Sequence, residues 1–203
     1  YYKASLGPHG TYKLLFSFKI MNTVLIDSFG REINYARLSV TDRCDFRCVY
    51  CMAEKMTFVP KKNVLSLEEL YQTAAALIAS GIRKIRLTGG EPLIRNDIMW
   101  LIKKISRLEG LEELTLTTNG SQLVKYAEQL KASGVRRINI SIDTLDADKF
   151  QTITRTGKLQ PVLDGIDAAI DAGFESIKLN SVILKNRNDD EIIPLINFAK
   201  KKS

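Results

Sequence analysis

The chain has 203 residues, of which 45% are hydrophobic and 26% charged, so it is long enough to bury one sizeable core. No apolar run approaches the roughly 20 residues that a membrane span requires, and the apolar stretch at residues 13–20 is too short and poorly flanked for a secretory signal. These features argue against a membrane protein, and we expect one cytoplasmic domain with no membrane partner.

The net charge of +7 does not by itself indicate a nucleic-acid partner. Part of the excess lies in the basic run at residues 200–202 and in Lys61 and Lys62, where we expect a solvated surface. These basic residues are not interleaved with aromatic residues, as they are in many RNA-binding surfaces. We therefore expect no nucleic-acid partner.

The first 20 residues show no clear hydrophobic period, and Met21 has the features of a natural start. We expect residues 1–20 to be a non-native or disordered leader, and we expect the lone His9 within it to have no chemical role. Residues 21–203 are predicted to form the folded domain.

From residue 35 onward, short strand-like runs alternate with longer helical patterns, which is typical of a parallel sheet with crossover helices. Ser66, followed by Glu69, predicts a helix start with a capping box, and Gly81 predicts its end. Gly134 and Gly173 end later helices in the same way, and a last helix is expected over residues 189–202. The predicted strands are residues 35–41, 82–88, 113–119, 136–143 and 175–182.

These strands alternate between apolar and polar residues, whereas parallel strands buried on both faces read as continuous apolar runs. One face of the sheet is therefore expected to be polar, and helices are expected to cover the other face. Right-handed crossovers on one side would curl the sheet and turn the polar face inward; the alternative is a solvated sheet face. The expected fold is α/β, a partial (β/α)6 barrel of TIM-like type. Its predicted polar face comprises Arg37, Ser39, Thr41, Lys84, Arg86, Thr88, Thr115, Thr117, Asn119, Asn139, Ser141, Asp143, Lys178 and Asn180.

Three cysteines, Cys44, Cys48 and Cys51, lie within eight positions, in the loop that follows the first predicted strand. Their odd number and close spacing argue against a disulfide framework, and parallel barrels place their sites in loops of this kind. Iron–sulfur clusters are normally held by four thiolates, so three cysteines on a cubane would leave one iron open. The alternative is a zinc ion, which would need a fourth protein ligand such as His9 or a nearby aspartate.

The cysteine spacing, together with the aromatic Tyr50 just before the third cysteine, resembles the motif of the radical S-adenosylmethionine (SAM) enzymes. The resemblance implies a [4Fe-4S] cluster on Cys44, Cys48 and Cys51, with SAM bound to the open iron. It also implies an electron donor, because reduction of SAM by the cluster releases a 5′-deoxyadenosyl radical in that family.

A second motif, residues 88–92 with the sequence Thr-Gly-Gly-Glu-Pro, ends the second predicted strand. Paired glycines before a proline often mark only a turn, but they also let a backbone approach a ligand closely. The resemblance implies that Gly90 binds SAM, with Glu91 nearby. It implies contacts to SAM from Tyr50 and Ser141 as well.

Four residues of the predicted polar face, Arg37, Arg86, Thr117 and Lys178, make residues 21–202 similar to the GTP 3′,8-cyclase family of molybdenum cofactor synthesis. The resemblance implies that these four side chains bind GTP. Cations that point into a lumen are costly unless they meet an anion, and a triphosphate supplies one. The alternative is that they form structural ion pairs with Asp143, Glu91 or Glu175.

The family continues past this point, with another barrel strand and a segment that bears a second three-cysteine cluster, but no cysteine follows Cys51 here. We therefore expect a barrel that is truncated at its C-terminal side. Three other interpretations stay open: a different radical SAM enzyme, such as one that modifies peptides; a truncated, inactive protein that binds cluster and SAM; and a zinc- or nucleic-acid-binding module. A homodimer is kept as a candidate assembly.

Overall fold

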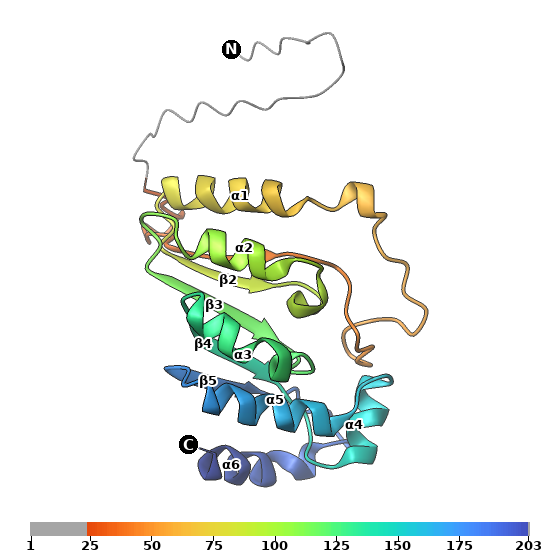
Figure 1. Cartoon of the computed structure of the whole chain (residues 1–203). Coiled ribbons are helices and arrows are strands. Elements are labelled where there is room, and N and C mark those ends of the chain that lie inside the picture. The colour runs from red at the N-terminus through yellow and green to blue at the C-terminus, as the bar shows by residue number, and fades with distance from the viewer. Residues whose placement is uncertain (1–23, 203) are drawn as a thin grey trace.

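The computed structural model describes residues 24–202. The predicted leader and His9 lie outside these residues. Five parallel strands form one sheet in the order β1-β2-β3-β4-β5, and Figure 1 shows α1, α2, α3 and α5 packed on one side of it. The predicted parallel α/β fold is therefore confirmed.

The elements follow one another as repeated strand–helix units. The strands are β1 (Tyr35–Ser39), β2 (Lys84–Thr88), β3 (Glu113–Thr118), β4 (Val135–Ser141) and β5 (Ser176–Asn180). The α-helices are α1 (Leu67–Ala79), α2 (Ile98–Ile105), α3 (Leu123–Ala132), α4 (Ala147–Thr154), α5 (Leu159–Asp171) and α6 (Ile192–Lys201). Short 3-10 helices are η1 (Lys61–Asn63), η2 (Pro92–Ile94) and η3 (Asp189–Glu191).

Helix α1 begins and ends where the sequence predicts. The Ser66 side chain accepts from the Glu69 amide at 3.1 Å, and the Glu69 carboxylate accepts from the Ser66 amide at 2.8 Å. Two amide groups that lack partners within the helix are thereby satisfied. Gly81 has φ +99°, a left-handed conformation that ends the helix at little steric cost.

The core lies between the sheet and its helices, where Ile85, Leu87, Leu116, Ile138 and Ile140 are fully buried. Burial of such side chains stabilises the fold by about 1.5–3 kcal/mol each. These residues are the apolar members of the predicted alternation, so the prediction of which side chains face the helices is confirmed.

On the other face, the middle of the sheet differs from the alternative of a solvated polar surface. Thr115 is 5% exposed and Asn139 is 8% exposed. The Arg86 side chain lies over β3 and donates from Nε to the Thr115 hydroxyl at 3.2 Å. A long basic side chain on one strand thus shields a short polar one on the next.

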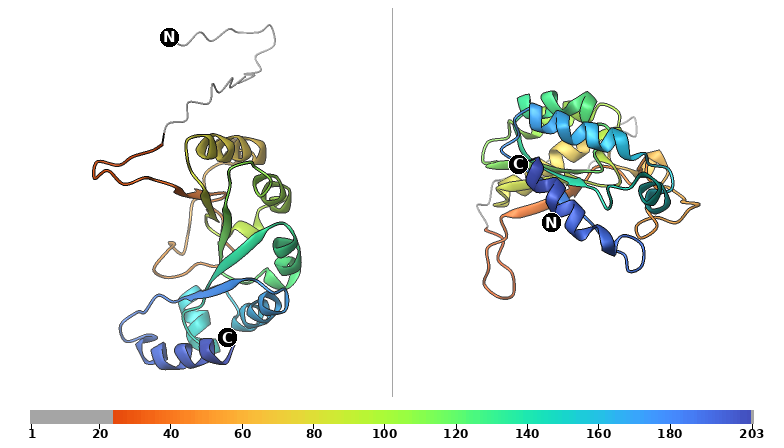
Figure 2. Two further views of the ribbon diagram at one scale, coloured as in Figure 1. Left: turned by 90° about the vertical axis from the view of Figure 1, so that its left-hand side faces the viewer. Right: turned by 90° about the horizontal axis from the view of Figure 1, so that it is seen from below.

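The sheet is curved, with α3 and α5 on its outer side (Figure 2). Polar residues alternate along the strands with the apolar ones that pack on these helices, so they face the inner side. Strands β1 and β5 are the two edges of the sheet. Because all strands are parallel, their carboxyl ends meet at one rim, where the cysteine loop and α4 also lie (Figure 1). Within residues 24–202, no helix is long and apolar enough to cross a membrane.

Candidate functional site

The three cysteines lie in the irregular segment after β1, which we call the cysteine loop (residues 44–52). Cys44 and Cys48 are partly buried, Cys51 is exposed, and all three are free thiols. A tight turn joins the last two, since the amides of Cys51 and Met52 both donate to the Cys48 carbonyl, at 2.9 and 3.0 Å. The loop therefore presents three separate sulfur atoms at the rim.

Burial raises the pKa of the Cys44 thiol to about 12 and that of the Cys48 thiol to about 11. The charges of Asp45 and Glu91 add to the rise at Cys44, and Asp143 adds to it at Cys48. With such pKa values the two thiols stay protonated and unreactive at neutral pH. Binding of a metal would remove these protons, because only the thiolate form is a metal ligand.

Within residues 24–202, no three His, Cys, Asp or Glu side chains converge on a point where one metal ion could be held. A structural zinc ion would need four ligands that converge on it. A cubane cluster instead gives each thiolate its own iron, and its ligands stay apart. The three free thiols are soft donors, which fit a [4Fe-4S] cluster.

The glycine motif after β2 is held against the start of the cysteine loop by main-chain hydrogen bonds. The Gly90 amide donates to the Thr41 carbonyl at 2.7 Å, and the Glu91 amide donates to the Arg43 carbonyl at 2.8 Å. A Cβ atom on Gly90 would overlap the Arg43 carbonyl oxygen and lie 2.5 Å from its carbonyl carbon. The close approach predicted for the glycines is thus made by the chain's own loop, and a role for Gly90 toward SAM stays a prediction.

Glu91 is fully buried beneath this turn and joins it to the end of β3. Its carboxylate accepts from the Leu93 amide at 3.0 Å, the Thr118 hydroxyl at 2.8 Å and the Asn119 amide at 2.6 Å. Burial raises the pKa of Glu91 from 4.5 to about 7, and these three donors oppose that rise. The folded chain binds this proton more tightly than the unfolded chain does, so the protonated Glu91 side chain stabilises the fold. This contribution to the free energy of unfolding is complete below about pH 4.5 and is lost as pH rises through about 7.

Asn119, in the loop after β3, connects Glu91 to the first cysteine. Its side-chain amide donates to Asp45 Oδ1 at 2.6 Å and reaches Cys44 Sγ at 3.8 Å. Asp45 also accepts from the Ser121 hydroxyl at 2.6 Å. The loops after β1, β2 and β3 therefore form one continuous polar network at the rim.

Tyr50, just before the third cysteine, is held by the end of β4. Its hydroxyl donates to Asp143 Oδ2 at 2.7 Å, and Asp143 Oδ1 accepts from the Val182 amide at 2.8 Å. Burial raises the pKa of the Asp143 carboxyl group, and burial beside that carboxylate raises the pKa of Tyr50. Ser141, partly buried at the end of β4, lies two residues before this contact and pairs with Asn180 of β5.

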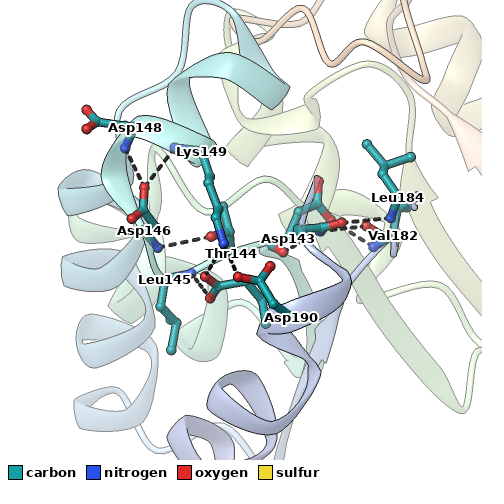
Figure 3. A network of polar contacts seen from close by, with 11 residues as sticks. Asp143, Thr144, Leu145, Asp146, Asp148, Lys149, Val182, Leu184 and Asp190 are labelled. Carbon is teal, nitrogen blue, oxygen red and sulfur yellow. Dashed lines mark hydrogen bonds and ion pairs between the residues drawn. The ribbon is translucent and has the colours of Figure 1, made fainter. Parts of the chain in front are cut away.

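A wider network fixes the position of Asp143 (Figure 3). The Asn188 side-chain amide donates to the Asp143 carbonyl at 2.6 Å, and the Leu145 amide donates to Glu191 Oε2 at 3.1 Å. Lys149 of α4 pairs with Asp190 at 2.5 Å and with Glu191 at 3.2 Å. The connection before α6 is thereby tied to the end of β4 and to α4.

The four residues predicted to bind GTP lie in two rows across the polar face. Arg37 of β1 is directly opposite Arg86 of β2, while Thr117 of β3 and Lys178 of β5 are each opposite Asn139 of β4. The buried Thr117 hydroxyl has no hydrogen-bond partner among residues 24–202. The register thus places two arginines side by side and a hydroxyl and a lysine on either side of one asparagine.

The alternative that these cations form structural ion pairs is not confirmed. Within the part of the chain that the structure describes, no acidic side chain lies within 4.0 Å of the charged groups of Arg37, Arg86 or Lys178. Glu175 pairs instead with Arg136 at 3.7 Å, while Glu91 and Asp143 have the partners given above.

Two hollows of about 440 and 450 Å³ lie beside the start of the cysteine loop and share the Thr41, Asp42 and Arg95 side chains in their walls. Arg95 stands between them and donates to the carbonyls of Val40 and Leu65. The walls of the second hollow include Ser39 of β1 and Gly90, which is predicted to bind SAM. Neither hollow is lined by the four predicted GTP residues.

The fold and the site together define a half-barrel protein with three thiols at the carboxyl rim of its sheet, an arrangement suited to an iron–sulfur cluster. The chain belongs to the radical SAM superfamily, whose family model matches residues 38–199. This superfamily uses a [4Fe-4S] cluster together with SAM, and these are the cofactors that membership assigns to the chain.

Relatives named "GTP 3′,8-cyclase" match most of the chain. The protein from Marinobacter nauticus is 61% identical over 180 residues, which cover 89% of this chain and 54% of the relative. The protein from Rhizobium etli is 61% identical over 177 residues, which cover 86% of this chain and 51% of the relative. The chain therefore spans about half the length of these relatives.

Solved structures share the fold at low sequence identity. Streptococcus suis SuiB, bound to precursor peptide SuiA, has a TM-score of 0.68 and 19% identity and covers 83% of this chain and 37% of its own. Coproporphyrinogen III oxidase (HemN) from Escherichia coli has a TM-score of 0.58 and 14% identity and covers 83% of this chain and 42% of its own. These likenesses support the partial barrel and carry no further argument.

Sequence reasoning missed the polar network that holds the predicted residues in place. Asp45 and Asn119 join two loops that lie 74 residues apart, and Asp143 holds Tyr50 across 93 residues. The one feature of the sequence that these residues share is their position, in a loop or at a strand end at the rim of the sheet. That position indicates proximity, but it does not specify which side chains pair.

Proposed function

We propose that the chain is the cluster- and SAM-binding part of a cytoplasmic GTP 3′,8-cyclase, a lyase that converts GTP to (8S)-3′,8-cyclo-7,8-dihydroguanosine 5′-triphosphate with an electron donor as partner. Relatives of that name, about 60% identical over most of the chain, support the proposal. The proposed cluster ligands are Cys44, Cys48 and Cys51; the proposed SAM contacts are Tyr50, Gly90 and Ser141; and the proposed GTP contacts are Arg37, Arg86, Thr117 and Lys178.

The observation that carries the proposal is the pair of neighbouring arginines, Arg37 and Arg86, that have no acidic partner among residues 24–202. Arg37 and Arg86 are in register on neighbouring strands, and like charges placed opposite one another destabilise a sheet. A triphosphate between the cations would replace that repulsion with charge-assisted hydrogen bonds. Lys178 and the unpartnered Thr117 hydroxyl, one level nearer the rim, are suited to other polar groups of the same nucleotide.

The cluster and SAM, when bound, supply a 5′-deoxyadenosyl radical that takes hydrogen from the ribose of GTP. The chain's own residues would orient and hold the reactants. The cations of β1, β2 and β5 would fix the nucleotide on the polar face, and the Tyr50–Asp143 hydrogen bond would fix the cysteine loop against the end of β4. Residues 21–203 are the proposed domain, and assembly as a homodimer stays a prediction.

Nucleotide binding by the anaerobically reconstituted chain tests this function. We expect GTP to bind in the presence of SAM, and we expect Arg86→Ala and Lys178→Ala each to weaken binding about tenfold or more, since a hydrogen bond to a charged group contributes about 1.5–3 kcal/mol. Lys103→Ala, on the outer helix α2, is the matched control and should bind as the wild type does.

The outcomes separate the competing functions. SAM binding without GTP binding would overturn the proposal and favour a different radical SAM reaction, such as peptide modification. GTP binding without any product would favour a protein that binds cluster, SAM and nucleotide without turnover.

A further inference from the structure

The last residues of α4 and the turn that follows it, residues 153–157, pack directly on the cysteine loop. The Arg47 amide donates to the Thr154 carbonyl, and the Val49 amide donates to the Ile153 carbonyl, both at 2.9 Å. The two carbonyls lie in the last turn of α4, where they have no partner within the helix. The end of α4 and the cysteine loop therefore satisfy each other's backbone groups.

Arg155, at the centre of this turn, holds both sides of the segment that carries the second and third cysteines. Its Nη1 donates to the Arg47 carbonyl at 3.1 Å and to the Met52 carbonyl at 3.0 Å. Residues 47 and 52 immediately flank Cys48 and Cys51. One guanidinium nitrogen thus holds together the two ends of the segment that carries Cys48 and Cys51.

The backbone of Arg155 is strained, with φ 60° and ψ −45°. A residue other than glycine keeps such a conformation only where its surroundings require it, and strain of this kind gathers at functional sites. Here the strained conformation ends α4 and accompanies the contact of the guanidinium group with the loop. Glycine would adopt it more easily but would bring no donor.

Further contacts from the same turn hold the first half of the loop. The Thr156 hydroxyl donates to the Asp45 carbonyl at 2.7 Å. Phe46 is buried against Phe150 of α4, with ring centroids 5.8 Å apart in an edge-to-face arrangement. A Cβ atom on Gly157 would lie 2.9 Å from the Phe46 ring, so only glycine lets the turn approach this closely.

We propose that Arg155 is a positioning residue that shapes the cysteine loop before any cluster is bound. The loop has no helix or strand of its own, so the spacing of its thiols depends on groups outside it. Arg155 supplies such a group from more than 100 residues away in sequence. The inference rests on the proposed cluster site, but the contacts that support it lie wholly within the chain.

Three substitutions at this position separate strain from hydrogen bonding. Arg155→Ala removes the guanidinium and keeps the strain, Arg155→Gly removes both, and Arg155→Lys keeps a cation. The matched control is Arg83→Ala, because Arg83 Nη1 also donates to two carbonyls, those of Ile78 and Ile82 at 3.1 and 3.2 Å, away from the cysteines.

Two measurements test the inference. In the cluster-free chain, hydrogen exchange at the amides of Val49, Cys51 and Met52 should become faster in the Ala and Gly variants and stay unchanged in the control. After reconstitution, a chelator should remove iron about tenfold faster from both variants, and the change in the electron paramagnetic resonance (EPR) spectrum on adding SAM should be altered. Arg155→Lys should fall between them and the wild type.

The results distinguish this inference from the proposed function. If the Gly variant retains the wild-type exchange rates, iron release and SAM-dependent spectrum, the positioning role of Arg155 is overturned while the proposed cluster site stands. If the wild type itself binds zinc, or takes up iron without sulfide, both are overturned.

Discussion

Replacing Gly90 by alanine tests whether the glycine motif exists to admit the segment that leads into the cysteine loop, residues 41–43. Gly90 is not among the glycines with positive φ, so alanine suits its backbone conformation and the cost is steric. The added Cβ would overlap the main chain of Arg43, which cannot rotate away as a side chain could. Loss of the two main-chain hydrogen bonds from Gly90 and Glu91 costs about 2 kcal/mol, and overpacking adds about 1–3 kcal/mol.

We therefore expect Gly90→Ala to lower the free energy of unfolding by about 3–5 kcal/mol, measured by urea titration of the cluster-free chain. Gly173→Ala is the matched control: Gly173 has φ +71° and no atom within 4 Å of an added Cβ, so only backbone strain of about 1–2 kcal/mol is expected. Iron content after reconstitution should fall in the first variant and not in the second. A Gly90→Ala chain within about 0.5 kcal/mol of the wild type, with full iron content, would refute the steric argument.

Three further substitutions test the rim. Glu91→Gln removes the carboxyl group whose pKa is raised to about 7. The loss of about 3 kcal/mol of stability that this group causes as pH rises from about 4 to 8 should therefore disappear from urea titrations, and an unchanged pH dependence would contradict this. Tyr50→Phe removes the donor to buried Asp143 and should lower the free energy of unfolding by about 1–3 kcal/mol, whereas a neutral result would mean that water replaces the hydroxyl. Asn119→Ala removes a donor to Cys44 Sγ and should make the reduction potential of a reconstituted cluster more negative in an EPR-monitored titration; an equal potential would show that the contact does not influence the cluster.

The sheet could be predicted from the sequence because a strand's period is local. Alternation alone assigned Ile85 and Leu116 to the covered face and Arg37 and Lys178 to the polar one. Strand ends were placed too far out, at residues 41 and 182, because polar alternation continues into the rim loops while the pairing of strands stops. There the main chain turns to bond other loops, as Thr41 does with Gly90.

The contacts of the site could be predicted much less well, since they depend on how the sheet curls. The sequence predicts that Glu91 lies near a cofactor. In the structure its carboxylate is fully buried and accepts a hydrogen bond from the Asn119 amide at the end of β3. Asp45 lies inside the cysteine motif, where the sequence offers no reason for a pair with Asn119. Arg155 follows α4 without any motif, and only its position in space relates it to the cysteines.

The separation of Arg155 from the cysteine loop has a consequence for the order of events during synthesis. Each strand pairs with the next one along the chain, so the strand–helix units can dock one after another as they leave the ribosome. The cysteine loop is made early, but its contacts with Arg155 span 103 and 108 residues. At about 5–20 residues per second, the three thiols wait about 5–20 s before their surroundings are complete. Iron delivered earlier than that would meet a loop that does not yet have its final shape.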